Sequence, residues 1–107
     1  MKSQAILLIT LCLLTLSLTP ALSSETSNEI FLKNCEAEKT WWFMGAFSTL
    51  GLQVAQTDKT KADCIWNWYA TNRLHKNKEL EAAMRKYPKH APSTIVMGIL
   101  QRDCGKF

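Results

Sequence analysis

The residues best suited to chemistry in this chain of 107 residues are its cysteines and its two histidines. A cysteine nucleophile needs a free thiolate beside a histidine base. Only His75 and His90 are available, and we expect both in links between helices. The cysteine spacings match neither the usual zinc patterns nor a haem-attachment motif. The sequence therefore predicts a protein that is not an enzyme and carries no metal or other cofactor.

The N-terminus has the three regions of an export signal: Lys2, the apolar run Ala5–Leu18 and the small residues Ala21–Ser23. The apolar run is too short for a membrane anchor. We expect cleavage to remove residues 1–23 together with Cys12, leaving residues 24–107 as one domain without a membrane span. The expected location is the periplasm, with the extracellular space as the alternative.

The three remaining cysteines are expected to form disulfides, because exported chains fold in an oxidising compartment. A bond between Cys64 and Cys104 would close a loop of roughly 40 residues and stabilise the domain by about 3–4 kcal/mol. The alternatives are Cys35–Cys64 and Cys35–Cys104. The odd count leaves Cys35, on the expected core stripe, either as a buried free thiol or as an intermolecular bridge.

The four tryptophans form two close pairs. On a helix, Trp41 and Trp42 lie about 100° apart and Trp66 and Trp68 about 200° apart, so neither pair can enter a single core. Trp42 and Trp66 lie on the apolar stripes, whereas Trp41, near Met44, and Trp68 lie off them. Because interfaces are enriched in aromatic anchors, we expect Trp41, Met44 and Trp68 to bind a partner. The alternative is that a neighbouring helix covers the two tryptophans.

The elements that must position these residues are expected to be helices. The capping box Thr26–Glu29 predicts a helix start, and apolar residues then recur with helical spacing. We expect one long helix to about Leu50, with a break at Gly45 or Gly51. The polar interval Gln56–Asp63 predicts a loop that contains the next helix start.

The second half of the chain continues the helical pattern. A helix after the polar interval is expected to pause at His75, Lys76 and Asn77, where Asn77 caps a further segment that Pro88 ends. Pro92 suits the first turn of a last helix. Because links between helices are exposed, His75 and Lys76 are weaker candidates for partner binding. The predicted fold is all-α, a small disulfide-linked bundle of three to four helices.

Four features occur in a familiar order: Cys35, Trp42 three residues before Gly45, Cys64, and the closing run MRKYPKHAPSTIVMGILQRDC. This order resembles the small periplasmic immunity proteins of the Rap/Tai group, which protect bacteria against peptidoglycan amidases delivered by type VI secretion. The chain departs from the family's commoner pattern at Thr40, where a second cysteine is usual. The resemblance implies a stoichiometric inhibitor that occludes an amidase's active-site cleft, and it also implies dimers.

The charge pattern limits the other functions. Residues 24–107 carry 12 basic and 9 acidic residues, a net charge of +3, and the signs alternate along the chain. With no basic stripe, nucleic acid is not expected as a partner. The alternative function is a periplasmic acid-stress chaperone of the HdeA and HdeB type. Its trigger would be the protonation of buried or interfacial carboxylates, and the predicted helices contain few of them. Homodimerisation is a competing use of the same aromatic faces.

Overall fold

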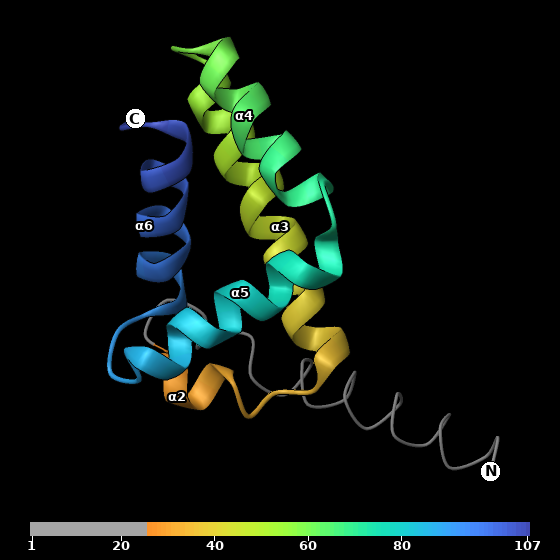
Figure 1. The fold of residues 1–107 in the computed structure, drawn as a ribbon, viewed down its shortest axis with the longest axis vertical. Helices are drawn as coiled ribbons and strands as arrows, with labels where there is room; N and C mark the ends of the chain where they lie inside the picture. The colour runs from red at the N-terminus through yellow and green to blue at the C-terminus, as the bar shows by residue number, and fades with distance from the viewer. Residues whose placement is uncertain (1–25) are drawn as a thin grey trace, which may run out of the picture.

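The computed structural model describes residues 26–107, so the expected export signal and Cys12 lie outside the described residues. Within this range the chain forms helices and no strand, which confirms the prediction of an all-α fold (Figure 1). There are five described helices instead of three to four: α2 (Asn28–Phe31), α3 (Glu36–Ala55), α4 (Lys59–Ala70), α5 (Arg73–Lys86) and α6 (Pro92–Cys104). None of them is long and apolar enough to cross a membrane.

The first expected helix is divided in two. Ser27, and not Thr26, is the N-cap of α2, and its hydroxyl oxygen accepts a hydrogen bond from the N–H of Ile30. The chain then turns over residues 32–35, and α3 runs to Ala55 without a break at either glycine. Asp58 caps α4 by accepting from the N–H of Lys61. The expected loop at 56–63 is therefore only a short turn.

Helices α3 and α4 form an antiparallel hairpin, and α6 lies beside them (Figure 1). The core between them is aromatic: the ring of Phe47 stacks on Tyr69 at 4.4 Å and on Trp68 at 5.5 Å between centroids. The indole of Trp66 lies directly over Gly51, which is buried. Only a residue without a side chain fits under that ring, so Gly51 sets how closely the two helices approach.

The link between α4 and α5 lies earlier than expected. The chain reverses at Asn72, which has a left-handed φ of 55° that asparagine adopts more readily than most residues. The Asn72 side chain accepts from the N–H of His75. Asn77, expected as a cap, is buried inside α5 and accepts a hydrogen bond from the hydroxyl of Tyr69 at 2.9 Å. His75 and Lys76 are therefore helical residues of α5, not parts of a link.

Helix α2 closes the end of the bundle opposite the α3–α4 turn (Figure 1). The backbone N–H groups of Asn28 and Glu29 donate to the carbonyls of His90 and Pro88, and the Asn28 side chain donates to the carbonyl of Tyr87 at 2.8 Å. These bonds hold α2 against the loop between α5 and α6. The last helix starts at Pro92 and ends before Gly105, as predicted.

Candidate protein-binding surface

The outer face of α3 carries an exposed row of residues that we call the α3 stripe: Trp41, Gly45, Ser48 and Leu52. Their spacing of four, three and four residues places them on one side of the helix. Trp41 is 64% exposed and Leu52 61% exposed. No charged residue occurs between Thr40 and Thr57. The stripe is therefore an uncharged surface with a large apolar side chain at each end and small residues in the middle.

The two adjacent tryptophans of α3 divide as predicted. Trp41 points to solvent, which confirms its expected exposure. Trp42 is partly buried and meets Phe31 and Phe43 edge to face, at 5.2 and 5.8 Å between ring centroids. Trp66 is likewise partly buried in the α3–α4 contact. One indole of α3 thus packs in the core while its neighbour exposes a large apolar area to solvent.

A shallow hollow of about 170 Å³ adjoins the α3 stripe at Ser48. The hollow is lined by Met44 and Ser48 of α3, by Trp66 and Ala70 of α4, and by Arg73 at the start of α5. The guanidinium carbon of Arg73 lies 5.4 Å from the centre of the Tyr69 ring. Met44, predicted as a partner contact, is half-buried in this hollow. The stripe and the hollow together form one surface across the α3–α4 hairpin.

Trp68 does not belong to this surface, and the prediction that it is an exposed anchor is wrong. It is 9% exposed, and its indole N–H donates to Oδ2 of Asp103 at 2.7 Å. The ammonium of Lys76 lies 4.2 Å from the centre of the same ring, a favourable cation–π contact. The alternative considered for Trp68, cover by neighbouring helices, is the one observed. Lys76 belongs to that cover, while His75 is exposed in the first turn of α5.

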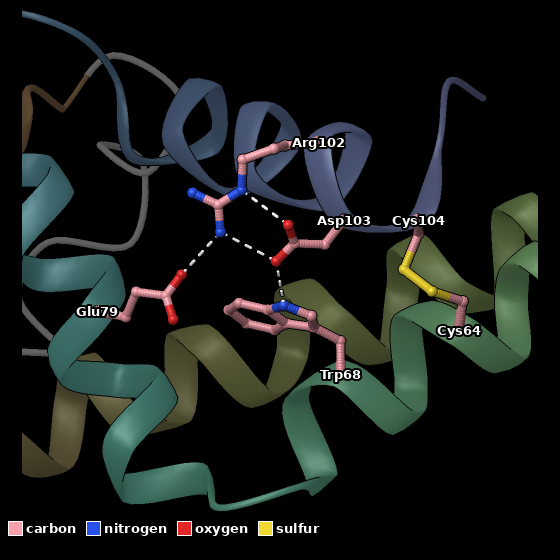
Figure 2. A network of polar contacts seen from close by, with 6 residues as sticks. All are labelled: Cys64, Trp68, Glu79, Arg102, Asp103 and Cys104. Carbon is pink, nitrogen blue, oxygen red and sulfur yellow. Dashed lines mark hydrogen bonds and ion pairs between the residues drawn. A yellow bond between two sulfur atoms is a disulfide. The ribbon is translucent and has the colours of Figure 1, made fainter.

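Trp68 is held by a polar network at the C-terminal end of α6 (Figure 2). The Arg102 guanidinium contacts both carboxylate oxygens of Asp103, at 2.7 and 2.9 Å, and reaches Glu79 of α5 at 3.0 Å. The hydrogen bond from Arg102, aided by the one from Trp68, lowers the pKa of Asp103 from its ordinary 3.8 to about 2. The same contacts raise the pKa of Arg102. The network fixes α6 against α4 and α5, and Asp103 keeps its negative charge down to about pH 2.

The disulfide between Cys64 and Cys104 is present, as predicted, with 5.8 Å between the Cα atoms, and it lies next to this network (Figure 2). It joins α4 to the last residue of α6. Cys35 is also disulfide-bonded, so the expectation of a free thiol there is wrong.

A buried lysine on the inner face of α3 was not foreseen. Lys39 is 4% exposed, and its ammonium lies 2.6 Å from Glu81 of α5 and 2.8 Å from Glu36. Burial disfavours the charged form, but the hydrogen bonds to Glu36 and Glu81 outweigh it and raise the pKa of Lys39 above 10.5. Lys39 lies four residues before the buried Phe43, and this register could have revealed its burial. The ion pair between Lys39 and Glu81 holds the start of α3 against α5.

The residues described here include no group of three or more histidine, cysteine, aspartate or glutamate side chains that could hold a metal ion. Comparisons of the chain with models of known protein families, with curated proteins and with solved structures find no match. Its surface chemistry, together with the resemblance noted from the sequence, is therefore the basis for a functional proposal.

Proposed function

We propose that this chain is an exported inhibitory binding protein. Its α3 stripe would occupy the active-site cleft of a peptidoglycan hydrolase, in the manner of type VI amidase immunity proteins. The observation that carries the proposal is the 64% exposure of Trp41 on an uncharged helix face. A large exposed aromatic on a small domain is typical of an interface anchor. The signal-like residues 1–23 support export, and the resemblance of the cysteine and aromatic order supports the choice of hydrolase.

The mechanism would be stoichiometric occlusion. Helix α3 is a rigid support, because the helices around it are held in place. The polar network at the C-terminal end of α6 and the disulfide fix α4 and α6, and the Lys39–Glu81 ion pair fixes α5 to α3. Trp41 would enter the cleft, and the hollow beside Met44 would receive a side chain of the hydrolase. Because the α3 stripe has no charge, it loses little hydration free energy when it is covered. Charged residues around it would guide the encounter.

One observation favours the acid-stress chaperone as the second candidate. Lys39 is buried with its ammonium against Glu81, and a buried ammonium without this counter-charge would destabilise the fold. The low pKa of Asp103 acts in the opposite direction, because it preserves the contacts of α6 to about pH 2. Circular dichroism from neutral pH to about pH 2 distinguishes the two functions. Retained helical structure throughout the titration would count against the chaperone.

The proposed function is tested by capturing partners from an envelope extract of the source organism at neutral pH, with mass spectrometry to identify them. Any hydrolase found is then assayed on purified peptidoglycan with increasing amounts of the protein. We expect complete inhibition near one equivalent. Trp41→Ala should weaken inhibition at least about 10-fold with an unchanged melting temperature.

The matched control is Leu74→Ala, because Leu74 is 78% exposed on α5 and lies outside the stripe. This variant should inhibit like the original protein. The proposal fails if no hydrolase is captured, or if the two variants inhibit equally well.

A further inference from the structure

The hollow between α3 and α4 combines an aromatic floor with hydrogen-bond donors at its rim. Phe47 and Tyr69, whose stacked rings are almost fully buried, form the floor beside the indole of Trp66. The polar side chains of the rim are Ser48 and Arg73. We infer that this hollow binds an acidic side chain of a partner protein and that Arg73 selects its carboxylate. The site rests on the proposed function in one respect, because the hydrolase is the partner expected to supply that side chain.

Both polar groups of the rim are open to a ligand. The exposed Arg73 guanidinium makes no ion pair with residues 26–107, and it lies 5.4 Å from the centre of the Tyr69 ring. The exposed Ser48 hydroxyl forms no hydrogen bond with a described group. The hydroxyl of Tyr69 is engaged, because it donates to Asn77 inside the bundle. A carboxylate is the side-chain group that accepts two parallel hydrogen bonds from an arginine.

The carboxylates of α3 and α4 lie away from the guanidinium. The residues of these helices that line the hollow carry no charge. Glu38 lies about 9 Å along α3 from the first of them. Asp63 precedes Trp66 by one turn of α4, about 10 Å along the helix from Ala70, whereas Arg73 follows Ala70 at the opposite end. Charges at such distances on an exposed surface are largely screened by salt.

The carboxylates of α5 are engaged elsewhere in the bundle. Glu79 contacts Arg102 at 3.0 Å, and Glu81 contacts Lys39 at 2.6 Å. The C-terminal end of α4 and the N-terminal end of α5 meet at the rim of the hollow, so their helix dipoles offset each other. The guanidinium of Arg73 is therefore the dominant charge at the hollow, and it favours a negative ligand.

The volume of the hollow sets the size of the ligand. About 170 Å³ is room for about five or six groups the size of a water molecule, which corresponds to one side chain as long as glutamate. Its methylene groups would lie on the rings of Phe47 and Trp66, and its carboxylate would reach Arg73 at the rim. Glutamine has a similar shape but no charge and a single acceptor oxygen, so the hollow should discriminate between the two.

An NMR titration of the purified protein with N-acetyl-glutamate N-methylamide tests the site without the hydrolase. We expect the indole N–H resonance of Trp66 to shift, with a dissociation constant of about 1–10 mM. The resonance of Trp68, whose N–H donates to Asp103, should stay in place. The glutamine analogue should bind at least about 5-fold more weakly, because it lacks the charge. Acetate should also bind at least about 5-fold more weakly, because it has no methylene groups for the aromatic floor.

Four substitutions separate the guanidinium from general surface charge. Arg73→Gln should bring the affinity for the glutamate probe down to that for the glutamine probe. Arg73→Lys should restore only part of the difference, because an ammonium lacks the planar fork. Lys78→Gln is the matched control, since Lys78 is an exposed cation of α5 outside the hollow, and it should bind like the original protein. Ala70→Leu fills the hollow from an exposed position and should weaken both probes. Circular dichroism should be unchanged in every variant.

Equal binding of the glutamate and glutamine probes, no shift of Trp66, or unchanged binding by Arg73→Gln would overturn the proposed carboxylate site. With the hydrolase, Arg73→Gln should weaken inhibition about 10-fold or more, and Lys78→Gln should not. If Arg73→Gln inhibits like the original protein while Trp41→Ala does not, the carboxylate site fails and the proposed function stands. If the probe binds through Arg73 but no hydrolase is captured, the proposed function fails and the carboxylate site stands.

Discussion

The contact between Gly51 and Trp66 gives a sharp test of the packing between α3 and α4. A Cβ at Gly51 would fall inside the indole of Trp66, 2.6 Å from Cδ1 and closer still to Nε1 and Cε2. These atoms belong to the rigid indole ring and not to the flexible end of a long side chain, so the whole ring must move away. We therefore expect Gly51→Ala to destabilise the domain although alanine is the better helix former.

The magnitude follows from two opposing effects. Replacing a helical glycine by alanine favours the helix by about 1 kcal/mol, whereas overpacking a filled contact costs about 1–3 kcal/mol. Because the clash is with atoms of a rigid ring and all of the nearest ones lie under 3 Å, we take the upper part of that range and expect a net loss of about 1–2 kcal/mol. For a domain of this size the loss corresponds to a fall in melting temperature of about 5–15 °C.

Gly45 supplies the matched control in the same helix, because its Cβ position is open. Gly45→Ala should stabilise the domain by up to about 1 kcal/mol. Urea unfolding followed by circular dichroism measures both variants. In the double variant with Trp66→Leu, much of the cost of Gly51→Ala should disappear. If Gly51→Ala instead stabilises as much as Gly45→Ala, the indole does not lie on Gly51.

The remaining predictions concern the C-terminal end of α6. The folded pKa of Asp103 is lowered to about 2, so its stabilising contribution is complete well above pH 3.8 and is lost as pH falls through about 2. Asp103→Asn should remove that part of the pH dependence of the free energy of unfolding. Urea unfolding at about pH 5 and pH 2 measures it, and a variant that loses as much stability between these two pH values as the original protein would contradict the prediction. Replacing Cys64 and Cys104 by serine should cost about 3–4 kcal/mol; a loss below about 1 kcal/mol would mean that packing alone holds α6.

The features predicted correctly from the sequence depend on short-range rules. The helical spacing of apolar residues gives the all-α class, and proline in the first turn marks the start of α6 at Pro92. The difference between Trp41 and Trp42 follows from the 100° step between neighbouring residues. The export signal predicts disulfides, and the pairing of Cys64 with Cys104 closes a loop of roughly 40 residues, which is long enough to stabilise a small domain.

The errors arise where a distant partner decides the outcome. Trp68 lies off the apolar stripe of its own helix, but it is buried because Asp103, 35 residues later, supplies a hydrogen-bond acceptor for the indole. Lys39 is buried because Glu81 supplies a counter-charge from another helix. The helical periodicity of a sequence indicates on which face of its own helix a residue lies. It does not report which polar group from elsewhere covers that face.

The division between α2 and α3 and the turn at Asn72 have a similar cause. A capping box and helical spacing predicted one continuous helix from Thr26 to Leu50. The carbonyls of Pro88 and His90 instead hold the N–H groups at the start of α2, and the chain must turn before α3 to reach both sites. Asn77 was expected as a cap, but it is buried against Tyr69, and Asn72 is the N-cap of α5 instead.

The attachment of α2 to the loop between α5 and α6 also sets the order in which the molecule assembles. Helices α3 and α4 are neighbours in the chain, and such local contacts form early in folding. The carbonyls that hold α2 come from residues about 60 positions later, so its site exists only after α5 and α6 have met. The contacts of Phe31 with Trp42 and Phe43 are closer in the chain, but α2 gains its backbone bonds to the loop only at this later step. The interval between these two steps is when the unfinished chain is most exposed to aggregation.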